Sequence, residues 1–173
     1  RRTCSTTAKM TSETADDRVA WLDLAGRIEG LSHVLPIRVY YEDTDFSGAV
    51  YHASYLRFCE RGRSDFLRLI GVGHRELQAG HWGGRSLGFV VRRLVADYVR
   101  PAGIDDLLEV RTRFLGVSGA RFVLEQSVNR GLDAVFRQEV TIALVDAAGR
   151  PARLPADLAG LIRPYVAENG TRS

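Results

Sequence analysis

Cysteine is scarce in this sequence, and so are long apolar runs. The two cysteines, Cys4 and Cys59, are too few for a disulfide framework and lack the spacing of metal ligands. No stretch reaches the roughly 18 to 20 uncharged apolar residues that a membrane-spanning helix needs. These absences exclude a disulfide-stapled domain and an integral membrane protein. Together with the lack of a signal-peptide pattern, they predict a cytoplasmic protein.

A large excess of one charge sign is also missing. The net charge is +3, but Arg1, Arg2 and Lys9 precede residue 10, and the remaining 21 basic residues are matched by 21 acidic ones. A neutral body gives no electrostatic reason to expect a nucleic-acid partner. With 173 residues, 45% of them hydrophobic, the chain can bury its own core. We expect one domain over residues 31–165, preceded by a flexible extension (1–30) and followed by a frayed end (166–173).

Most signatures of nucleotide, zinc-protease and redox chemistry are absent, since no P-loop, G-x-G-x-x-G after a strand, H-E-x-x-H or C-x-x-C occurs. Residues 84–88 match the G-x-S-x-G pattern of a serine nucleophile elbow. That class places its histidine after the serine, whereas the last histidine here is His81, and a strand pattern follows where a helix should. We interpret the segment as a glycine-rich loop. The spacing of His33, His74 and His81 favours surface or loop positions over metal ligation.

Hydrophobic periodicity divides the chain into helical and extended segments. Apolar residues recur at helical spacing in 17–28, which predicts a short amphipathic helix, and from 52 to 70, which is the strongest helical pattern of the chain. Brief helices are expected at 74–78 and after Pro155. Five segments have the period of two that is typical of strands, namely 35–41, 87–99, 107–115, 121–129 and 134–145.

Five strands and one long apolar helix predict an α+β fold. An antiparallel sheet of this size hides its inner face most simply by curling around the helix. We expect the last four strands to form a meander in chain order. The open sheet edges predict association by sheet extension, into a homodimer or a homotetramer.

The segment from Tyr40 to Arg63 carries the residues best suited to chemistry. Glu42, Asp43 and Asp45 follow a strand and lead through a glycine into the N-terminus of the long helix. Unpaired N–H groups at a helix N-terminus can polarise a carbonyl, and a nearby carboxylate can activate water or attack directly. These parts suit acyl chemistry. The alternative is an acidic turn that only caps the helix dipole.

The same segment resembles the signature of a known family. Its pattern is Asp45-x-x-Gly48-x-Val50-Tyr51-His52-x-x-Tyr55-x-x-x-x-Glu60-x-x-Arg63. This is similar to the hotdog-fold acyl-CoA thioesterases related to 4-hydroxybenzoyl-CoA thioesterase, and most of all to the Tol-Pal-associated YbgC group. The likeness extends over roughly residues 35–147. It implies the hotdog fold, a five-stranded antiparallel sheet wrapped around one long central helix, in agreement with the elements expected from periodicity.

The resemblance implies a role for each matching residue. Asp45 corresponds to the catalytic carboxylate, as general base or nucleophile, and the N–H of His52 to the group that polarises the thioester carbonyl. The His52 side chain would orient Asp45 or water. Glu60 lies about two turns further on, so it should face the same side and reach the acyl pocket, often from a neighbouring subunit. The remaining matches would bind or shape the substrate site, namely Gly48, Val50, Tyr51 and Tyr55.

Coenzyme A carries several phosphate charges, which suit arginine. Arg92, Arg93, Arg113 and Arg121 are the candidate ligands, and a solvated strand face is the alternative reading of each. No metal or redox cofactor is implied, because coenzyme A is part of the substrate.

The implied activity is hydrolysis of acyl-CoA to free coenzyme A and a carboxylic acid, with acyl carrier protein as an alternative carrier. Two other functions stay open. One is a non-catalytic binding or scaffold module of the same fold, associated with the cell envelope. The carboxylate of Asp45 argues against it, because a binder of anionic coenzyme A gains nothing from a negative charge there. The other is a hotdog hydratase or dehydratase, whose His-plus-acid motif the sequence lacks.

Overall fold

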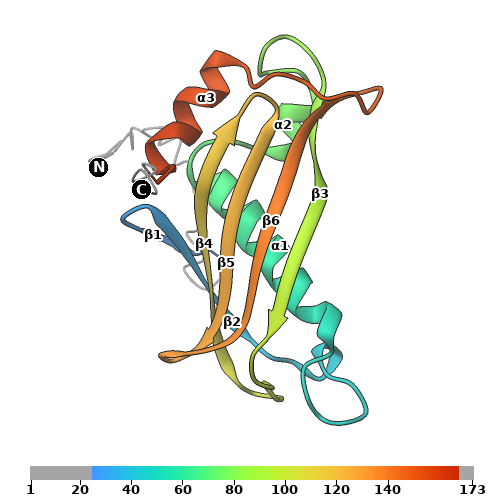
Figure 1. Cartoon of the computed structure of the whole chain (residues 1–173), viewed down its shortest axis with the longest axis vertical. Helices are drawn as coiled ribbons and strands as arrows, with labels where there is room; N and C mark the ends of the chain where they lie inside the picture. Colours follow the sequence, from blue (N-terminus) through green and yellow to red (C-terminus); the bar gives the residue numbers. More distant parts are fainter. Residues whose placement is uncertain (1–24, 168–173) are drawn as a thin grey trace, which may run out of the picture.

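The structure is a computed structural model that describes residues 25–167. Its strands are β1 (Arg27–Glu29), β2 (Ser32–Arg38), β3 (Leu87–Tyr98), β4 (Leu107–Ser118), β5 (Arg121–Arg130) and β6 (Asp133–Asp146). Its helices are α1 (His52–Leu69), α2 (His74–Gln78) and α3 (Ala156–Ile162), with 3-10 turns η1 (Tyr41–Asp43) and η2 (Arg163–Tyr165). The sheet curls around α1 (Figure 1), which confirms the expected α+β hotdog arrangement.

The strand order is β1-β2-β4-β5-β6-β3, and all neighbours are antiparallel. The expected meander is therefore correct for β4, β5 and β6 but wrong for β3, which pairs with β6. The reason is the helical connection: α1 crosses the inner face of the sheet, and α2 packs against β3 at the far edge. The chain then returns toward β2, where the N–H of Val39 donates to the carbonyl of Asp106 (3.0 Å), so β4 starts beside β2.

The sheet has one strand more than the five expected. Arg27 and Ile28 were expected at the end of a helix over 17–28, but they lie in β1, and residues 17–24 fall outside the described part. Gly30, with φ of +60°, starts a tight turn that pairs Glu29 with Ser32. This hairpin geometry overrides the short helical pattern, because a left-handed glycine suits a two-residue turn between antiparallel strands.

The core lies between α1 and the inner face of the sheet. Phe58 and Phe66 of α1 are fully buried and belong to two adjoining apolar clusters. At the C-terminal end, Val166 bridges to Phe114, and the N–H of Ala167 donates to the carbonyl of Phe114 (3.1 Å). The first two residues of the segment expected to fray are thus tied to β4. None of the helices within residues 25–167 is long and apolar enough to cross a membrane.

Candidate active site

The loop between β2 and α1 is shaped by short-range hydrogen bonds. The carboxylate of Asp43 accepts a bond from the N–H of Tyr40 (2.9 Å), which ends the extended segment earlier than its sequence pattern predicts. The N–H of Asp45 then donates to the carbonyl of Ala49, and the N–H of Gly48 to the carbonyl of Asp45, both at 3.0 Å. Gly48 has φ of +80°, which favours glycine over any residue with a Cβ. The result is a tight turn directly before α1.

The carboxylate of Asp45 is exposed on this turn. Its Oδ1 accepts hydrogen bonds from the hydroxyl of Ser47 (2.6 Å) and from the N–H of Ser47 (2.8 Å). These two bonds, with a smaller contribution from nearby His52, lower the pKa of Asp45 below its ordinary value. Asp45 is therefore an ionised carboxylate at neutral pH.

Helix α1 begins at His52, as the sequence pattern predicts. Its N-cap residue Tyr51 provides no side-chain cap, and the N–H groups of His52 and Ala53 find no acceptor within residues 25–167. The hydroxyl of Tyr98 donates to the carbonyl of His52 (3.1 Å), which holds this end of the helix against β3. An 18-residue helix carries a partial positive charge at its N-terminus. The free N–H groups can therefore stabilise a developing oxyanion.

A shallow hollow of about 260 Å3 lies beside His52, and Val50, Tyr55 and Tyr98 line it. Val50 and Tyr55 are buried, at 6% and 3% exposure. The hydroxyl of Tyr55 accepts a hydrogen bond from the N–H of Ala102 (3.1 Å), so it fixes the wall of the hollow. Tyr51 is more exposed, and its ring centre lies 4.3 Å from that of His52.

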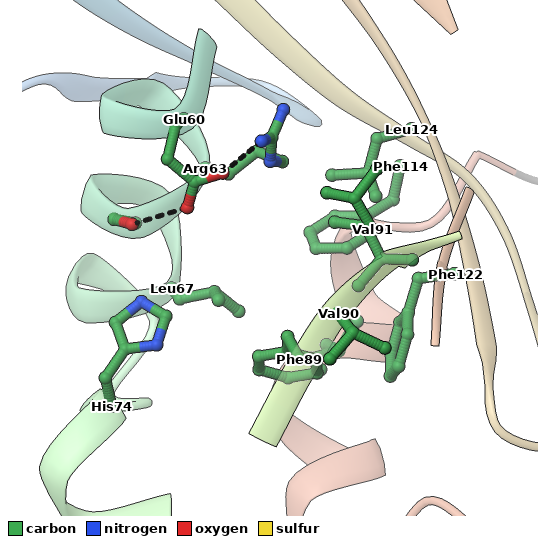
Figure 2. A pocket seen from close by; sticks show the side chains of 13 residues that line it. Glu60, Arg63, Leu67, His74, Phe89, Val90, Val91, Phe114, Phe122 and Leu124 are labelled. Carbon is green, nitrogen blue, oxygen red and sulfur yellow. Dashed lines mark hydrogen bonds and ion pairs between the residues drawn. The ribbon is translucent and has the colours of Figure 1, made fainter. Parts of the chain in front are cut away.

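A second cavity, of about 60 Å3, lies between α1 and β3 and is called the Glu60 cavity below. Figure 2 shows Glu60, Leu67 and His74 on one side and Phe89, Val90 and Val91 of β3 on the other. Its polar lining consists of Glu60, Arg63, Ser64 and His74, and the rest is aliphatic or aromatic. The cavity therefore suits an apolar group with a polar atom at its rim.

Within one chain, Asp45 lines neither of these two hollows and lies apart from Glu60. Glu60 lies eight residues beyond His52, which is about 12 Å along a helix axis. It lines the Glu60 cavity and is not part of the hollow beside His52. The single chain therefore brings together Asp45, His52 and Tyr51 but leaves Glu60 apart.

The candidate coenzyme A ligands lie on β3, β4 and β5. Arg92 occupies the bulge in β3, and Arg93 is 3.7 Å from Glu139 on the outer face of the sheet. Arg121 is exposed on β5 at an outward position of the strand, and Arg113 on β4 pairs with a glutamate of β5. These side chains do not gather around Asp45, and their contact with coenzyme A stays a prediction.

His33 corrects one expectation, because it lies neither on the surface nor in a loop. It is fully buried on β2, and its Nε2 is 2.9 Å from the carboxylate of Asp65, which also accepts a bond from the N–H of Gly26 (2.7 Å). Alternation in β2 puts His33 on the same side as buried Leu35, and this alternation in the sequence could have indicated that His33 is buried. The pairing with Asp65 needs the fold, because 32 residues separate the two.

Two other sequence interpretations concern a glycine-rich segment and two histidines. Residues 84–86 of the G-x-S-x-G segment form a loop, with Gly84 at φ of +69°, and its last two residues, Leu87 and Gly88, begin β3. His74 and His81 are exposed. Within residues 25–167, no three His, Cys, Asp or Glu side chains are grouped as metal ligands.

A curled antiparallel sheet around one helix, with a carboxylate at the helix N-terminus, defines a hotdog-type enzyme site. Residues 39–162 match the thioesterase-like superfamily. Acyl-CoA thioesterase YbgC of Haemophilus influenzae is 40% identical over 124 residues, which cover 71% of this chain and 88% of that protein. The chain therefore belongs to the thioesterase-like superfamily.

Solved structures agree with this assignment. A probable thioesterase from Bartonella henselae is 48% identical with a TM-score of 0.69, and the match covers 72% of this chain and 99% of that one. A thioesterase from Thermus thermophilus, solved as a complex with coenzyme A and zinc, is 27% identical with a TM-score of 0.66 over 80% of this chain and 96% of that one.

Proposed function

We propose that this protein hydrolyses acyl-CoA thioesters to free coenzyme A and a carboxylic acid. The observation that carries the proposal is the exposed, ionised carboxylate of Asp45 beside the uncapped N-terminus of α1. The similarity to acyl-CoA thioesterase YbgC of Haemophilus influenzae supports the same reaction. Nothing comparable supports a non-catalytic module of this fold.

In the proposed reaction, the thioester carbonyl oxygen points at the free N–H of His52. In one route, Asp45 removes a proton from a water molecule that attacks the carbonyl carbon. In the other, the carboxylate of Asp45 attacks the carbonyl carbon and forms an anhydride, which water then hydrolyses. In both routes the C–S bond breaks, coenzyme A leaves as a thiolate that takes up a proton, and water supplies an oxygen of the acid. Base and oxyanion site both come from the protein, so we propose no metal or redox cofactor.

We also propose a homodimer formed through β3, with a tetramer as a further step. β3 pairs only with β6 and is an edge of the described sheet. Five of its apolar or aromatic side chains are between 36% and 52% exposed, namely Val90, Val91, Leu94, Val95 and Tyr98. A long exposed edge of this kind is a template for pairing with another strand. A second copy of β3 is the matching occupant, because it presents the same apolar edge.

Antiparallel pairing of two β3 strands would also complete the site. It places Tyr98 at the end of one strand beside the start of the other strand. Tyr98 lies next to His52, with ring centres 6.5 Å apart, whereas Phe89 near the start of β3 lines the Glu60 cavity. The dimer would therefore bring Asp45 and His52 of one subunit toward the Glu60 cavity of the other.

The Glu60 cavity then becomes the proposed acyl site. Its volume in the single chain, about 60 Å3, is small, so we propose a preference for short acyl groups. Acyl carrier protein is the alternative carrier, and we propose the cytoplasm as the location. Association with the Tol-Pal system is proposed from the likeness to the YbgC group alone. Neither nucleic-acid binding nor membrane insertion is part of the proposal.

The test is thiol release from acyl-CoAs of increasing length, from acetyl to palmitoyl, with a benzoyl thioester and the matching acyl carrier protein substrates. Asp45→Asn should lower kcat by orders of magnitude with an unchanged melting temperature, because the side chain is exposed. Glu42→Gln removes another exposed carboxylate of the same segment and should retain activity. Full activity of Asp45→Asn would overturn the role proposed for Asp45, and inactivity of the wild type toward every substrate of the panel would overturn the proposed reaction.

A further inference from the structure

Arg63 is a buried cation on α1 with partners on two sides. Its side chain is 8% exposed. One guanidinium nitrogen donates to Oε1 of Gln126 at 2.7 Å, and another donates to the carboxylate of Glu60. Figure 2 shows this second contact at the rim of the Glu60 cavity. Arg63 thus joins the interior of the sheet to an acidic group at the cavity.

The sheet fixes the acceptor that anchors Arg63. Gln126 on β5 is fully buried, and its Nε2 donates to the carbonyl of Cys59 (2.9 Å) and to the hydroxyl of Thr112 (2.8 Å). Because Nε2 is engaged in this way, Oε1 has to face Arg63. Gln138 on β6 donates to the same oxygen at 2.7 Å. The acceptor is therefore held from both neighbouring strands.

This anchoring changes what the contact with Glu60 can do. Two exposed side chains three residues apart on a helix hold each other weakly, because both are free to move. Here one partner is buried and anchored, while the Glu60 side chain is 57% exposed. Glu60 is also the only carboxylate within 4.0 Å of the Arg63 guanidinium among residues 25–167. Leaving a buried charge unpaired is costly, so the pair constrains the direction of the Glu60 carboxylate.

We propose that Arg63, anchored by Gln126, is a positioning residue that holds the Glu60 carboxylate at the rim of the Glu60 cavity for thioester hydrolysis. This inference rests on the proposed function, because it assigns Glu60 to the reacting part of that site. Ser64 adds a weaker contact, with its hydroxyl 3.4 Å from the other carboxylate oxygen of Glu60. A carboxylate held in one direction contributes to the transition state without reorganising, so its misplacement lowers kcat more than it changes KM.

The test is a double-mutant cycle between Gln126 and Glu60. Gln126 cannot touch the substrate, because it is fully buried. Gln126→Met removes the anchor at similar volume and should lower kcat by roughly ten- to a hundred-fold with KM within about two-fold. In a Glu60→Gln background, the same substitution should have no further effect on kcat. Thr112→Val removes one of the two bonds that orient Gln126 and leaves its bonds to Cys59 and Arg63 in place, so it should lower kcat much less than Gln126→Met does.

Several results would overturn the inference. They are an equal loss of kcat from Gln126→Met in both backgrounds, a comparable loss from Thr112→Val, or full activity of Glu60→Gln. Full activity of Glu60→Gln together with an inactive Asp45→Asn would leave the proposed function standing, whereas inactivity of the wild type would remove both. If Gln126→Met does not fold, Arg63→Lys takes its place in the cycle, because lysine keeps the charge but lacks the rigid fork of two nitrogens that spans Gln126 and Glu60.

Discussion

The hydroxyl of Ser47 lies 2.6 Å from a carboxylate oxygen of Asp45, and the N–H of the same serine lies 2.8 Å from that oxygen. Both donors stabilise the ionised form, so they lower the pKa of Asp45. Hydrolysis by either proposed route needs this carboxylate ionised. Ser47 therefore sets how far activity extends toward acid pH.

We predict that Ser47→Ala raises the pKa of Asp45 toward its ordinary value of about 3.9. The acid limb of the kcat/KM profile should move to higher pH, while activity at pH 7 changes little, because Asp45 stays ionised there. Thr44→Val is the control, since the Thr44 hydroxyl bonds to the carbonyl of Tyr41 and not to Asp45. An acid limb at the same pH in Ser47→Ala and the wild type would contradict the prediction.

The second prediction concerns the open edge at β3. Introducing charge with Leu94→Lys and Val95→Lys should prevent edge pairing and give a monomer by sedimentation velocity. Loss of the dimer should lower activity, because the Glu60 cavity would no longer face Asp45 and His52 of the second subunit. Leu31→Lys, at a similarly exposed residue between β1 and β2, should leave both properties unchanged. A fully active monomer would refute the shared site.

Local patterns predicted the parts of the fold that depend on neighbouring residues. Helix α1 starts at His52 and ends at Leu69, within one residue of the expectation, because its apolar stripe has a clear helical period and a glycine follows. The long strands β5 and β6 lie within one residue of their expected ends, and in β5 buried positions alternate with more exposed ones. The same reasoning located Asp45 and Gly48 in the turn before α1.

Non-local features could not be predicted in this way. The position of β3 beside β6 depends on how α1 and α2 carry the chain across the sheet, and the hydrophobic period of a single segment does not predict this. The pairing of Gln126 with Arg63, 63 residues apart, also needs the closed sheet. A weak local signal did exist, since Gln126 lies between buried Leu124 and Val128 at an inward position of β5. The separation of Asp45 from Glu60, by contrast, follows from the helix itself, because eight residues of α1 lie between His52 and Glu60.

The third prediction tests the close approach of α1 to the sheet. A Cβ on Gly62 would lie 2.9 Å from a methyl group of Val110 and 3.1 Å from the hydroxyl of Thr112. Gly62→Ala should therefore lower the free energy of unfolding by about 1 to 3 kcal/mol in urea denaturation. Gly160→Ala in α3 meets nothing within 4 Å and should raise it by about 0.5 to 1 kcal/mol. A stabilising Gly62→Ala would show that the helix has room to move away.

The last prediction follows from the burial of His33. Burial lowers the pKa of His33, and the hydrogen bond to Asp65 opposes this only in part. The unfolded chain, with a histidine pKa near 6.5, therefore takes up a proton at a higher pH than the folded protein does. Below about pH 6.5 this proton favours the unfolded state, so stability falls as the pH drops toward the lower folded pKa. For one proton the slope is at most about 1.4 kcal/mol per pH unit.

Urea denaturation at pH 7.5, 6.5 and 5.5 measures this slope. His33→Gln keeps a donor for Asp65 but does not titrate, so its stability should be lower at pH 7.5 yet depend less on pH than that of the wild type. His81→Gln, at an exposed histidine, should keep the wild-type slope. An unchanged slope in His33→Gln would assign the acid sensitivity to other groups. In that case the contact between His33 and Asp65 would only anchor β2 to α1. The carboxylate of Asp65 also accepts the bond from the N–H of Gly26, so it ties the start of the described chain to the same point.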